Sequence, residues 1–327
     1  MDAQVDWPNH ERAWREWRAA SGGTRMHHGW MLAGKRGLGK HDFALAAAAE
    51  LVAEAGVPQP VDPANHPDII VLTYGPKDDK AEKAAAEGKP YDRARSIRIR
   101  QVRAMQRRLT TRPTLGARRV VIVDPADDLE RAAANALLKS LEEPPQGTFF
   151  LLVTHAPARL LPTIRSRCRV LRFPPLSDAQ LSAMLDAAGA SSDPASRSAA
   201  LKAAEGSFGA AQRFAEQDLG PLARVMEGLL DGADPAMTGR GELARLIGPR
   251  ADRERLQATF DLAQAMVASR ARETGSNALR GALVEAHSKL VRLAGEAPTH
   301  NYDTGLLSLE IGTLLVEASA ASEPADG

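Results

Sequence analysis

Cysteine is almost absent from this sequence: Cys168 is the single cysteine among 327 residues. One cysteine excludes a disulfide within the chain and any zinc site built from several thiolates. The eight histidines include no pair at helical spacing with a third ligand nearby. We therefore expect no metal centre and no zinc, and the missing disulfides fit a reducing cytoplasm.

An excess of charge of one sign is also lacking. The chain has 42 Lys and Arg residues against 41 Asp and Glu residues, for a net charge of +1. Bulk charge therefore predicts no partner, and any affinity for nucleic acid must come from a local patch. No apolar run approaches the length of a membrane span, and the first residues lack the apolar stretch of a secretory signal. These absences favour a cytoplasmic protein without a membrane partner.

Aromatic residues make up only 4% of the chain, and alanine is abundant, which favours helices. The length predicts two or three domains. Runs typical of buried strands occur only before residue 176, at 30–33, 68–72, 119–124, 148–154 and 170–173. Three short helices are predicted between 178 and 217, and longer helices follow from about 220. We therefore predict an α/β domain at 1–175 and helical domains at 176–218 and 219–327.

A glycine-rich loop follows the first predicted strand and precedes an apolar helix. It contains Gly34, Gly37, Gly39, Lys40 and His41. Such glycines let backbone amides close around phosphate groups, the helix N-terminus adds its dipole, and the lysine reaches phosphate oxygens. The alternative is a turn that merely caps a helix. The strand–loop–helix context favours a nucleotide-binding loop.

Two positions depart from a working nucleotide hydrolase. His41 stands where a Ser or Thr hydroxyl would bind Mg²⁺, and a neutral imidazole suits that hard ion poorly. Asp124 ends a strand where an acid would hold Mg²⁺, but Pro125 replaces the Glu that would polarise the attacking water. The loop is therefore degenerate, and nucleotide binding there is an open question.

A Ser166-Arg167-Cys168 triplet stands between two predicted strands. The planar guanidinium of arginine keeps its charge and binds phosphate oxygens bidentately. Arg167 is therefore either a phosphate-contacting residue at the rim of the sheet or a surface arginine beside a buried cysteine. Thr154 and His155 lie at the end of another predicted strand. They either contact a nucleotide phosphate or form an ordinary strand end in which the threonine hydroxyl is hydrogen-bonded within the protein.

Ten arginines and no acidic residue occur between 93 and 119. Without counter-charges this segment would create a local positive field, so contact with nucleic-acid phosphates and a merely solvated face are both open. Residues 75–92 are polar and alanine-rich. They are predicted to be exposed, and their order is undecided.

Together these motifs resemble the delta-prime subunits of bacterial DNA polymerase III clamp loaders, which are AAA+ proteins. The resemblance covers most of residues 24–175, and beyond residue 220 it is only architectural. The motifs that carry it are His27-His28-Gly29-Trp30, His66-Pro67-Asp68, Asp124-Pro125-Ala126-Asp127, Asn135-Ala136-Leu137-Leu138-Lys139, Leu141-Glu142-Glu143-Pro144-Pro145 and Ser166-Arg167-Cys168.

The resemblance implies an α/β AAA+ module, a three-helix lid and an all-α collar that closes a ring. It implies that Arg167 is an arginine finger acting in trans on the ATP site of a gamma/tau subunit, with Ser166 and Cys168 fixing its loop. The implied partners are the gamma/tau and delta subunits, the beta sliding clamp through the complex, and primer–template DNA at the replisome. No cofactor is required, although ATP or ADP binding could persist as a vestige.

Three rival hypotheses remain. An ATP-hydrolysing gamma/tau-like motor is disfavoured by His41, Pro125 and Ala210, the last replacing an arginine of gamma/tau subunits. A pure scaffold would leave Arg167 without a role in catalysis. An independent nucleic-acid-binding protein would use the arginine-rich segment.

Overall fold

The computed structural model describes residues 6–22, 26–190, 193–232, 234–249, 251, 253–297 and 302–320. The chain divides into two compact units, each described separately. The α/β unit comprises Trp7–Pro175, and the helical unit comprises the described residues from Leu176 onward. The domain boundary at 218/219 stays a prediction. Residues 1–5 and 321–327 lie outside the described part of the chain. The prediction that the N-terminus is not a secretory signal therefore falls partly on residues that are not described.

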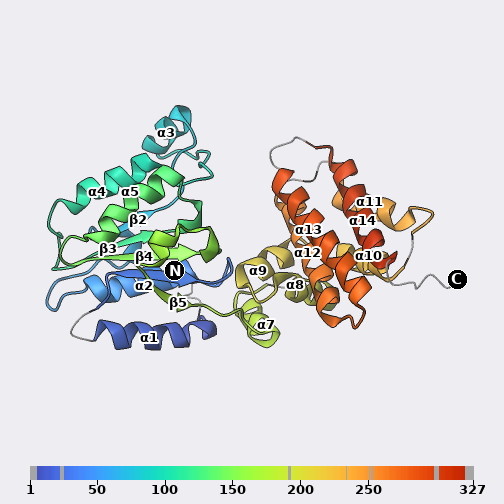
Figure 1. Ribbon diagram of the computed structural model, residues 1–327, viewed down its shortest axis with the longest axis horizontal. Helices are drawn as coiled ribbons and strands as arrows, with labels where there is room; N and C mark the ends of the chain where they lie inside the picture. The colour runs from blue at the N-terminus through green and yellow to red at the C-terminus, as the bar shows by residue number, and fades with distance from the viewer. Residues whose placement is uncertain are drawn as a thin grey trace. The chain divides into compact units, whose positions relative to one another are not determined.

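A five-stranded parallel sheet forms the centre of the α/β unit, in the order β2-β3-β4-β1-β5 (Figure 1). The strands are β1 (Gly29–Ala33), β2 (Ile69–Leu72), β3 (Arg119–Val123), β4 (Thr148–Thr154) and β5 (Arg169–Arg172). Except for the edge strand β5, which is mostly exposed, their near-continuous apolar sequences are typical of parallel strands that are covered on both faces. The predicted fold class, a parallel sheet with flanking helices followed by a helical region, is confirmed.

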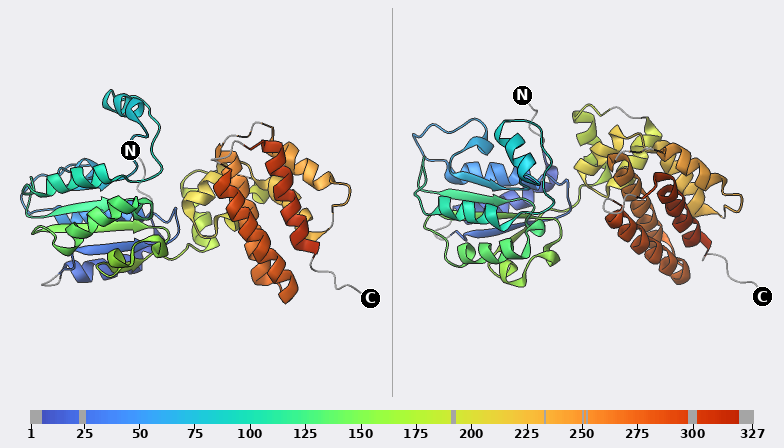
Figure 2. Two further views of the ribbon diagram at one scale, coloured as in Figure 1. Left: turned by 45° about the horizontal axis from the view of Figure 1, so that its top comes forward. Right: turned by 90° about the horizontal axis from the view of Figure 1, so that it is seen from above.

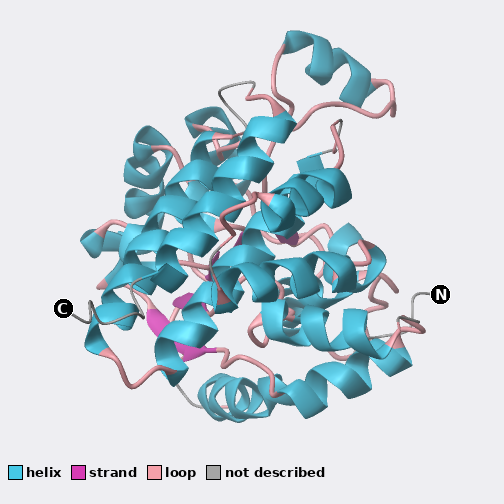
Figure 3. Cartoon of the chain, turned by 90° about the vertical axis from the view of Figure 1, so that its right-hand side faces the viewer, coloured by secondary structure: helices cyan, strands magenta, loops and turns pink. Residues whose placement is uncertain are grey.

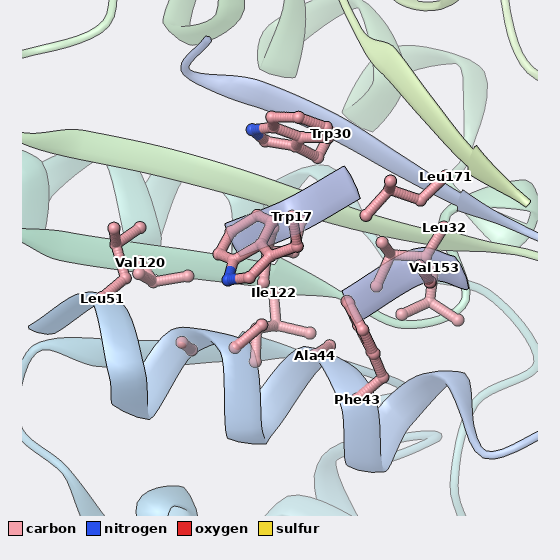
Figure 4. Close-up of a cluster of buried hydrophobic side chains, with 14 of the residues drawn as sticks. Trp17, Trp30, Leu32, Phe43, Ala44, Leu51, Val120, Ile122, Val153 and Leu171 are labelled. Atoms are coloured by element: carbon pink, nitrogen blue, oxygen red, sulfur yellow. The ribbon is translucent and has the colours of Figure 1, made fainter. Parts of the chain in front are cut away.

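Helices cover both faces of this sheet (Figures 1 and 2). On one face lie α1 (Glu11–Ser21) and α2 (Lys40–Val52), and on the other lie α4 (Ile99–Leu109) and α5 (Arg131–Glu142). Because side chains alternate along a strand, Trp30 and Leu32 pack toward the first pair and Met31 toward the second. Figure 4 shows the first core, where Trp17 and Phe43 approach the sheet.

Two segments differ in detail from the expectation. The polar segment 75–92 contains a helix, α3 (Asp79–Ala86), whose N-terminus is capped by the Asp78 carboxylate. The acidic run Asp127-Asp128-Leu129-Glu130 suits the first turn of a helix and predicts that a helix opens there. Instead a 3₁₀ turn, η3 (Ala126–Asp128), comes first and α5 starts at Arg131. The reason is that the Asp127 carboxylate accepts hydrogen bonds from the backbone N–H groups of His155 and Ala156 instead of capping the helix.

Short turns complete the α/β unit. They are η1 (Pro8–His10), η2 (Pro63–Asn65), η4 (Pro157–Arg159) and the single-turn helix α6 (Pro162–Arg165). The last of these leads directly into the Ser-Arg-Cys triplet, so the triplet follows a helical turn before β5 begins.

The described residues of the helical unit contain helices and no strand (Figure 3). Three short helices come first: α7 (Asp178–Ala187), α8 (Pro194–Ala204) and α9 (Phe208–Glu216). Longer ones follow: α10 (Gly220–Asp231), α11 (Thr238–Ile247), α12 (Arg253–Glu273), α13 (Asn277–Glu296) and α14 (Thr304–Ala320). None of the helices in the described part of the chain has both the length and the apolar character needed to cross a membrane.

Candidate nucleotide loop and arginine finger

The glycine-rich loop lies between β1 and α2, as the sequence predicts. Gly37 and Gly39 adopt φ angles of 75° and 70°, in the left-handed region that a side chain disfavours. A Cβ on Gly39 would also lie 2.2 Å from the indole of Trp7, which covers this point of the loop. Gly34 is required for a different reason, because a Cβ there would lie 2.5 Å from the carbonyl oxygen of Phe173.

Lys40 is buried at the first turn of α2, with 3% of its surface exposed. Its ammonium group donates to the carbonyl oxygen of Gly34 at 2.7 Å and to that of Lys35. An ammonium has three donors, so one remains for a phosphate oxygen. Burial lowers the pKa of Lys40 to about 8, an effect that Asp124 and Asp127 oppose. At neutral pH the lysine therefore still carries its charge.

His41 and Asp124 form a pair at the place where a magnesium ion would be handled. The Nδ1 atom of His41 lies 2.7 Å from Oδ2 of Asp124. The hydrogen bond to Asp124 raises the pKa of His41, although burial partly opposes it. The imidazole engages one of the two carboxylate oxygens of Asp124, and position 41 offers no hydroxyl as a magnesium ligand.

Thr154 and His155 lie beside this loop at the end of β4. The backbone N–H of Gly34 donates to the carbonyl of Thr154, and Thr154 is fully buried. Its Oγ1 and the Nδ1 of His155 have no hydrogen-bond partner among the described residues. Burial and the nearby charge of Lys40 lower the pKa of His155. These polar atoms are consistent with a phosphate-sensing position, which stays a prediction.

The Ser-Arg-Cys triplet and the glycine-rich loop lie at opposite ends of the strands of the sheet. It packs against Gly29, the first residue of β1, where a Cβ would meet the carbonyl oxygen of Arg167 at 2.8 Å and Sγ of Cys168 at 3.3 Å. The loop begins at Gly34, after the last residue of the same strand. A five-residue strand spans about 15 Å, so Arg167 is far from its own loop.

Cys168 and Ser166 both support this segment. Cys168 packs against the core between the sheet and α5, and burial raises the pKa of its thiol to about 12. It is therefore a structural thiol rather than a reactive one. The hydroxyl of Ser166 donates to the carbonyl of Thr163, closing the turn at 3.1 Å.

Arg167 is folded back onto its own protein. One terminal nitrogen, Nη1, donates to the carbonyl of Thr163 at 2.8 Å, and the other, Nη2, lies 2.7 Å from Oε1 of Glu142. Its side chain is 34% exposed. Glu142 belongs to the Leu-Glu-Glu-Pro-Pro motif, but sequence reasoning assigned it no partner, because no local spacing links positions 142 and 167.

The arginine-rich segment 93–119 is less uniformly positive than its sequence suggests. Arg119 is buried and pairs with the fully buried Asp68 at 3.2 Å, while also donating to carbonyls of the preceding loop. Burial acts to raise the pKa of Asp68, but hydrogen bonds from Leu115, Thr114 and Arg119 outweigh it and lower that pKa. Arg100 pairs with Glu82 of α3. The expectation of a segment without counter-charges is wrong, because acids distant in sequence supply them.

Arginines without such partners remain on the surface of this segment. Arg103 and Arg107 are exposed on α4, and Arg112 and Arg118 are exposed in the loop before β3. No group of three or more His, Cys, Asp or Glu side chains within the described ranges is arranged to hold a metal ion.

The strand order, the glycine-rich loop after β1 and the helical region that follows define an α/β AAA+ module. A solved structure of a DNA polymerase III gamma-subunit-related protein from Thermotoga maritima shares this fold. Its TM-score is 0.50 at 18% identity, and the match covers 94% of this chain and all of the other.

A family model described as DNA polymerase III, delta subunit, matches residues 9–177. The chain belongs to this family. A delta-prime subunit of Pseudomonas aeruginosa is 36% identical over 162 residues, which are 46% of this chain and 44% of that protein. The Bacillus subtilis delta-prime subunit is 32% identical over 161 residues, with the same coverage. The match thus spans less than half the length of these relatives, and the resemblance to delta-prime subunits is confirmed.

A tau/gamma subunit of Haemophilus influenzae is also similar, with 29% identity over 169 residues, or 49% of this chain and 22% of that protein. The two delta-prime subunits named above have higher identities than this tau/gamma subunit.

Proposed function

We propose that this protein is the delta-prime subunit of a DNA polymerase III clamp loader. In this role it completes an AAA+ ring and supplies Arg167 to the ATP site of a neighbouring gamma/tau subunit. The observation that carries the proposal is the placement of Arg167 at the end of the strands opposite its own glycine-rich loop. A guanidinium so placed can meet a nucleotide phosphate only on another molecule.

The chemistry expected of Arg167 is electrostatic. Charge develops on the transferred phosphoryl group, and an arginine supplied in trans stabilises this charge. Such an arginine raises the rate of hydrolysis by a factor of about 10³ to 10⁵. The turn closed by Ser166 and the packing of Cys168 fix the backbone position of Arg167. The long arginine side chain would then extend from this point to the phosphate on the neighbouring subunit.

The subunit's own loop is proposed not to hydrolyse ATP. His41 is hydrogen-bonded to the Asp124 carboxylate, and the Pro125 side chain has no basic group to activate water. The buried Lys40 is still directed into the loop, which supports retention of ATP or ADP without turnover. A nucleotide held there would supply binding energy between subunits rather than chemistry.

The proposed partners are the gamma/tau and delta subunits, with the beta sliding clamp and primer–template DNA engaged by the whole complex. The helical unit is proposed to contribute the lid and collar of the ring. The exposed arginines Arg103, Arg107, Arg112 and Arg118 are proposed to attract the phosphate backbone of DNA, which requires binding that weakens steeply with salt.

The test is ATP hydrolysis by the chain alone and by the chain mixed with gamma/tau and delta, with and without primed DNA. We expect no turnover by the chain alone, and DNA-stimulated turnover in the mixture that falls at least tenfold with Arg167→Ala. Arg165→Ala, two residues away in α6, is the matched control. Unchanged turnover with Arg167→Ala and intact assembly would refute the finger role.

The second candidate function is that of an ATP-hydrolysing motor, and the buried, correctly directed Lys40 favours it. In that case the isolated chain would hydrolyse ATP, and Lys40→Ala would abolish the activity. The same assay therefore separates the two functions.

A further inference from the structure

We propose that Glu142 holds Arg167 in a withdrawn position and competes with the partner's nucleotide phosphate for the guanidinium. This inference rests on the proposed finger role and concerns how that finger is regulated. A carboxylate and a phosphate present similar pairs of oxygen atoms to arginine. When Arg167 pairs with Glu142, it therefore makes the contact that a phosphate would otherwise receive.

The geometry shows the guanidinium held from two directions. Nη2 lies 2.7 Å from Oε1 of Glu142, and Nη1 donates to the carbonyl of Thr163 at 2.8 Å and to Oγ of Ser166 at 3.4 Å. The contacts to Thr163 and Ser166 come from the arginine's own turn. Glu142 is the only carboxylate paired with Arg167 within the described part of the chain, and it comes from a different element.

Glu142 is held at a fixed place by its neighbours. It is the last residue of α5, and the preceding Leu141 is buried in the core. The carbonyl of Leu141 accepts a hydrogen bond from Nε2 of His28 at 2.8 Å, and His28 leads into β1. The carboxylate is therefore presented from a rigid corner where α5, β1 and the Ser-Arg-Cys segment meet.

Helix stability does not account for a glutamate at this position. The C-terminus of a helix carries partial negative charge, which disfavours an acidic residue there. Glu143 follows immediately and adds a second negative charge. The counter-charge that offsets this arrangement is the guanidinium of Arg167.

The pair is suited to exchange because it is open to water. The side chains of Arg167 and Glu142 are 34% and 50% exposed. Ion pairs at such exposure contribute about 0.2–1 kcal/mol, which corresponds to a factor of at most about five in population. Glu142 therefore holds Arg167 weakly enough for a phosphate to displace the carboxylate. Replacing Glu142 should then speed ATP hydrolysis by the complex.

The experiment compares Glu142→Gln with Glu143→Gln in the complete complex with gamma/tau and delta. Both substitutions remove one charge from adjacent exposed positions, but only Glu142 pairs with Arg167. DNA-stimulated ATP hydrolysis is measured at saturating ATP at low and high salt, together with complex assembly and the thermal midpoint. We expect Glu142→Gln to raise kcat by up to about fivefold at low salt, and less at high salt. Glu143→Gln should leave kcat unchanged.

The double variant Glu142→Gln/Arg167→Ala gives the second readout. It should match Arg167→Ala, because the gain requires the arginine. If Arg167→Ala lowers turnover while Glu142→Gln leaves it unchanged or lowers it, the competition is overturned and the finger role stands. If Arg167→Ala has no effect, the finger role and this inference both fail.

Discussion

At the scale of single residues, His41 shows how one replacement changes the chemistry of a familiar loop. A hydroxyl at this position would face a metal ion, whereas the imidazole faces Asp124 at 2.7 Å. The two side chains are hydrogen-bonded directly to each other. The loop keeps a buried lysine and glycines in the left-handed region, while the Asp124 carboxylate is paired with His41.

The His41–Asp124 pair predicts a specific titration. The pKa of His41 should lie above its ordinary value of about 6.5, and Asp124→Asn should lower it. Asp42→Asn should lower it less, because Asp42 contributes only the smallest of the favourable effects. NMR titration of the His41 ring protons measures both shifts, and an equal response to the two variants would contradict the assignment.

The same pair gives the sign of a stability effect. Because folding raises the pKa of His41, its contribution is fully present below pH 6.5 and is lost as the pH rises through the elevated pKa. The His41 side chain is 44% exposed, so the contribution should stay below about 1 kcal/mol.

At the scale of elements, the buried Asp68–Arg119 pair joins the start of β2 to β3 and to the loop that follows α4. Asp68 accepts hydrogen bonds from the backbone N–H groups of Thr114 and Leu115, and Arg119 donates to the carbonyls of Thr111 and Arg112. An irregular loop is thereby fixed against the edge of the sheet.

Removing one member of this pair should be costly. Arg119→Met would leave the buried Asp68 charge without its partner, and we expect a loss of about 3–5 kcal/mol in the free energy of unfolding. Arg118→Met is the matched control, since Arg118 is exposed and its replacement should change stability by less than about 0.5 kcal/mol. Urea denaturation measures both, and similar values for the two variants would show that the pair does not stabilise the fold.

The elements also show where sequence reasoning succeeds and where it stops. The strands and the position of the glycine-rich loop were predictable because apolar runs and glycine spacing are local signals. The start of α5 was predicted wrongly because the Asp127 carboxylate bonds to the chain beyond β4, nearly thirty residues away. The charge balance of segment 93–119 was missed for the same reason, since Asp68 and Glu82 lie outside it.

At the scale of the whole molecule, the tryptophans offer a probe of one unit. All four, Trp7, Trp14, Trp17 and Trp30, lie in the α/β unit. The two large core clusters of that unit draw all their residues from between positions 13 and 173. Tryptophan fluorescence should therefore report the unfolding of this unit alone, whereas far-UV circular dichroism reports both.

This arrangement predicts separable transitions. In Arg119→Met the fluorescence midpoint should fall, while the part of the circular dichroism signal that arises from the helical unit should keep its wild-type midpoint. The reason is that the substitution removes a contact inside the α/β core and none in the helical unit. Coincident shifts of both signals would show that the two units unfold as one.

The sequence by itself determined the parallel α/β unit, the helical region after it, the glycine-rich loop and the residue types at positions 41 and 125. Each of these features follows from residue types at short spacing along the chain, because backbone geometry and local chemistry determine the local structure. The tertiary structure alone decided that His41 pairs with Asp124, that Arg119 is buried on Asp68 and that Arg167 rests on Glu142. These pairings join residues 25 to 83 positions apart, and only the packing of helices against the sheet brings such charges within hydrogen-bonding distance.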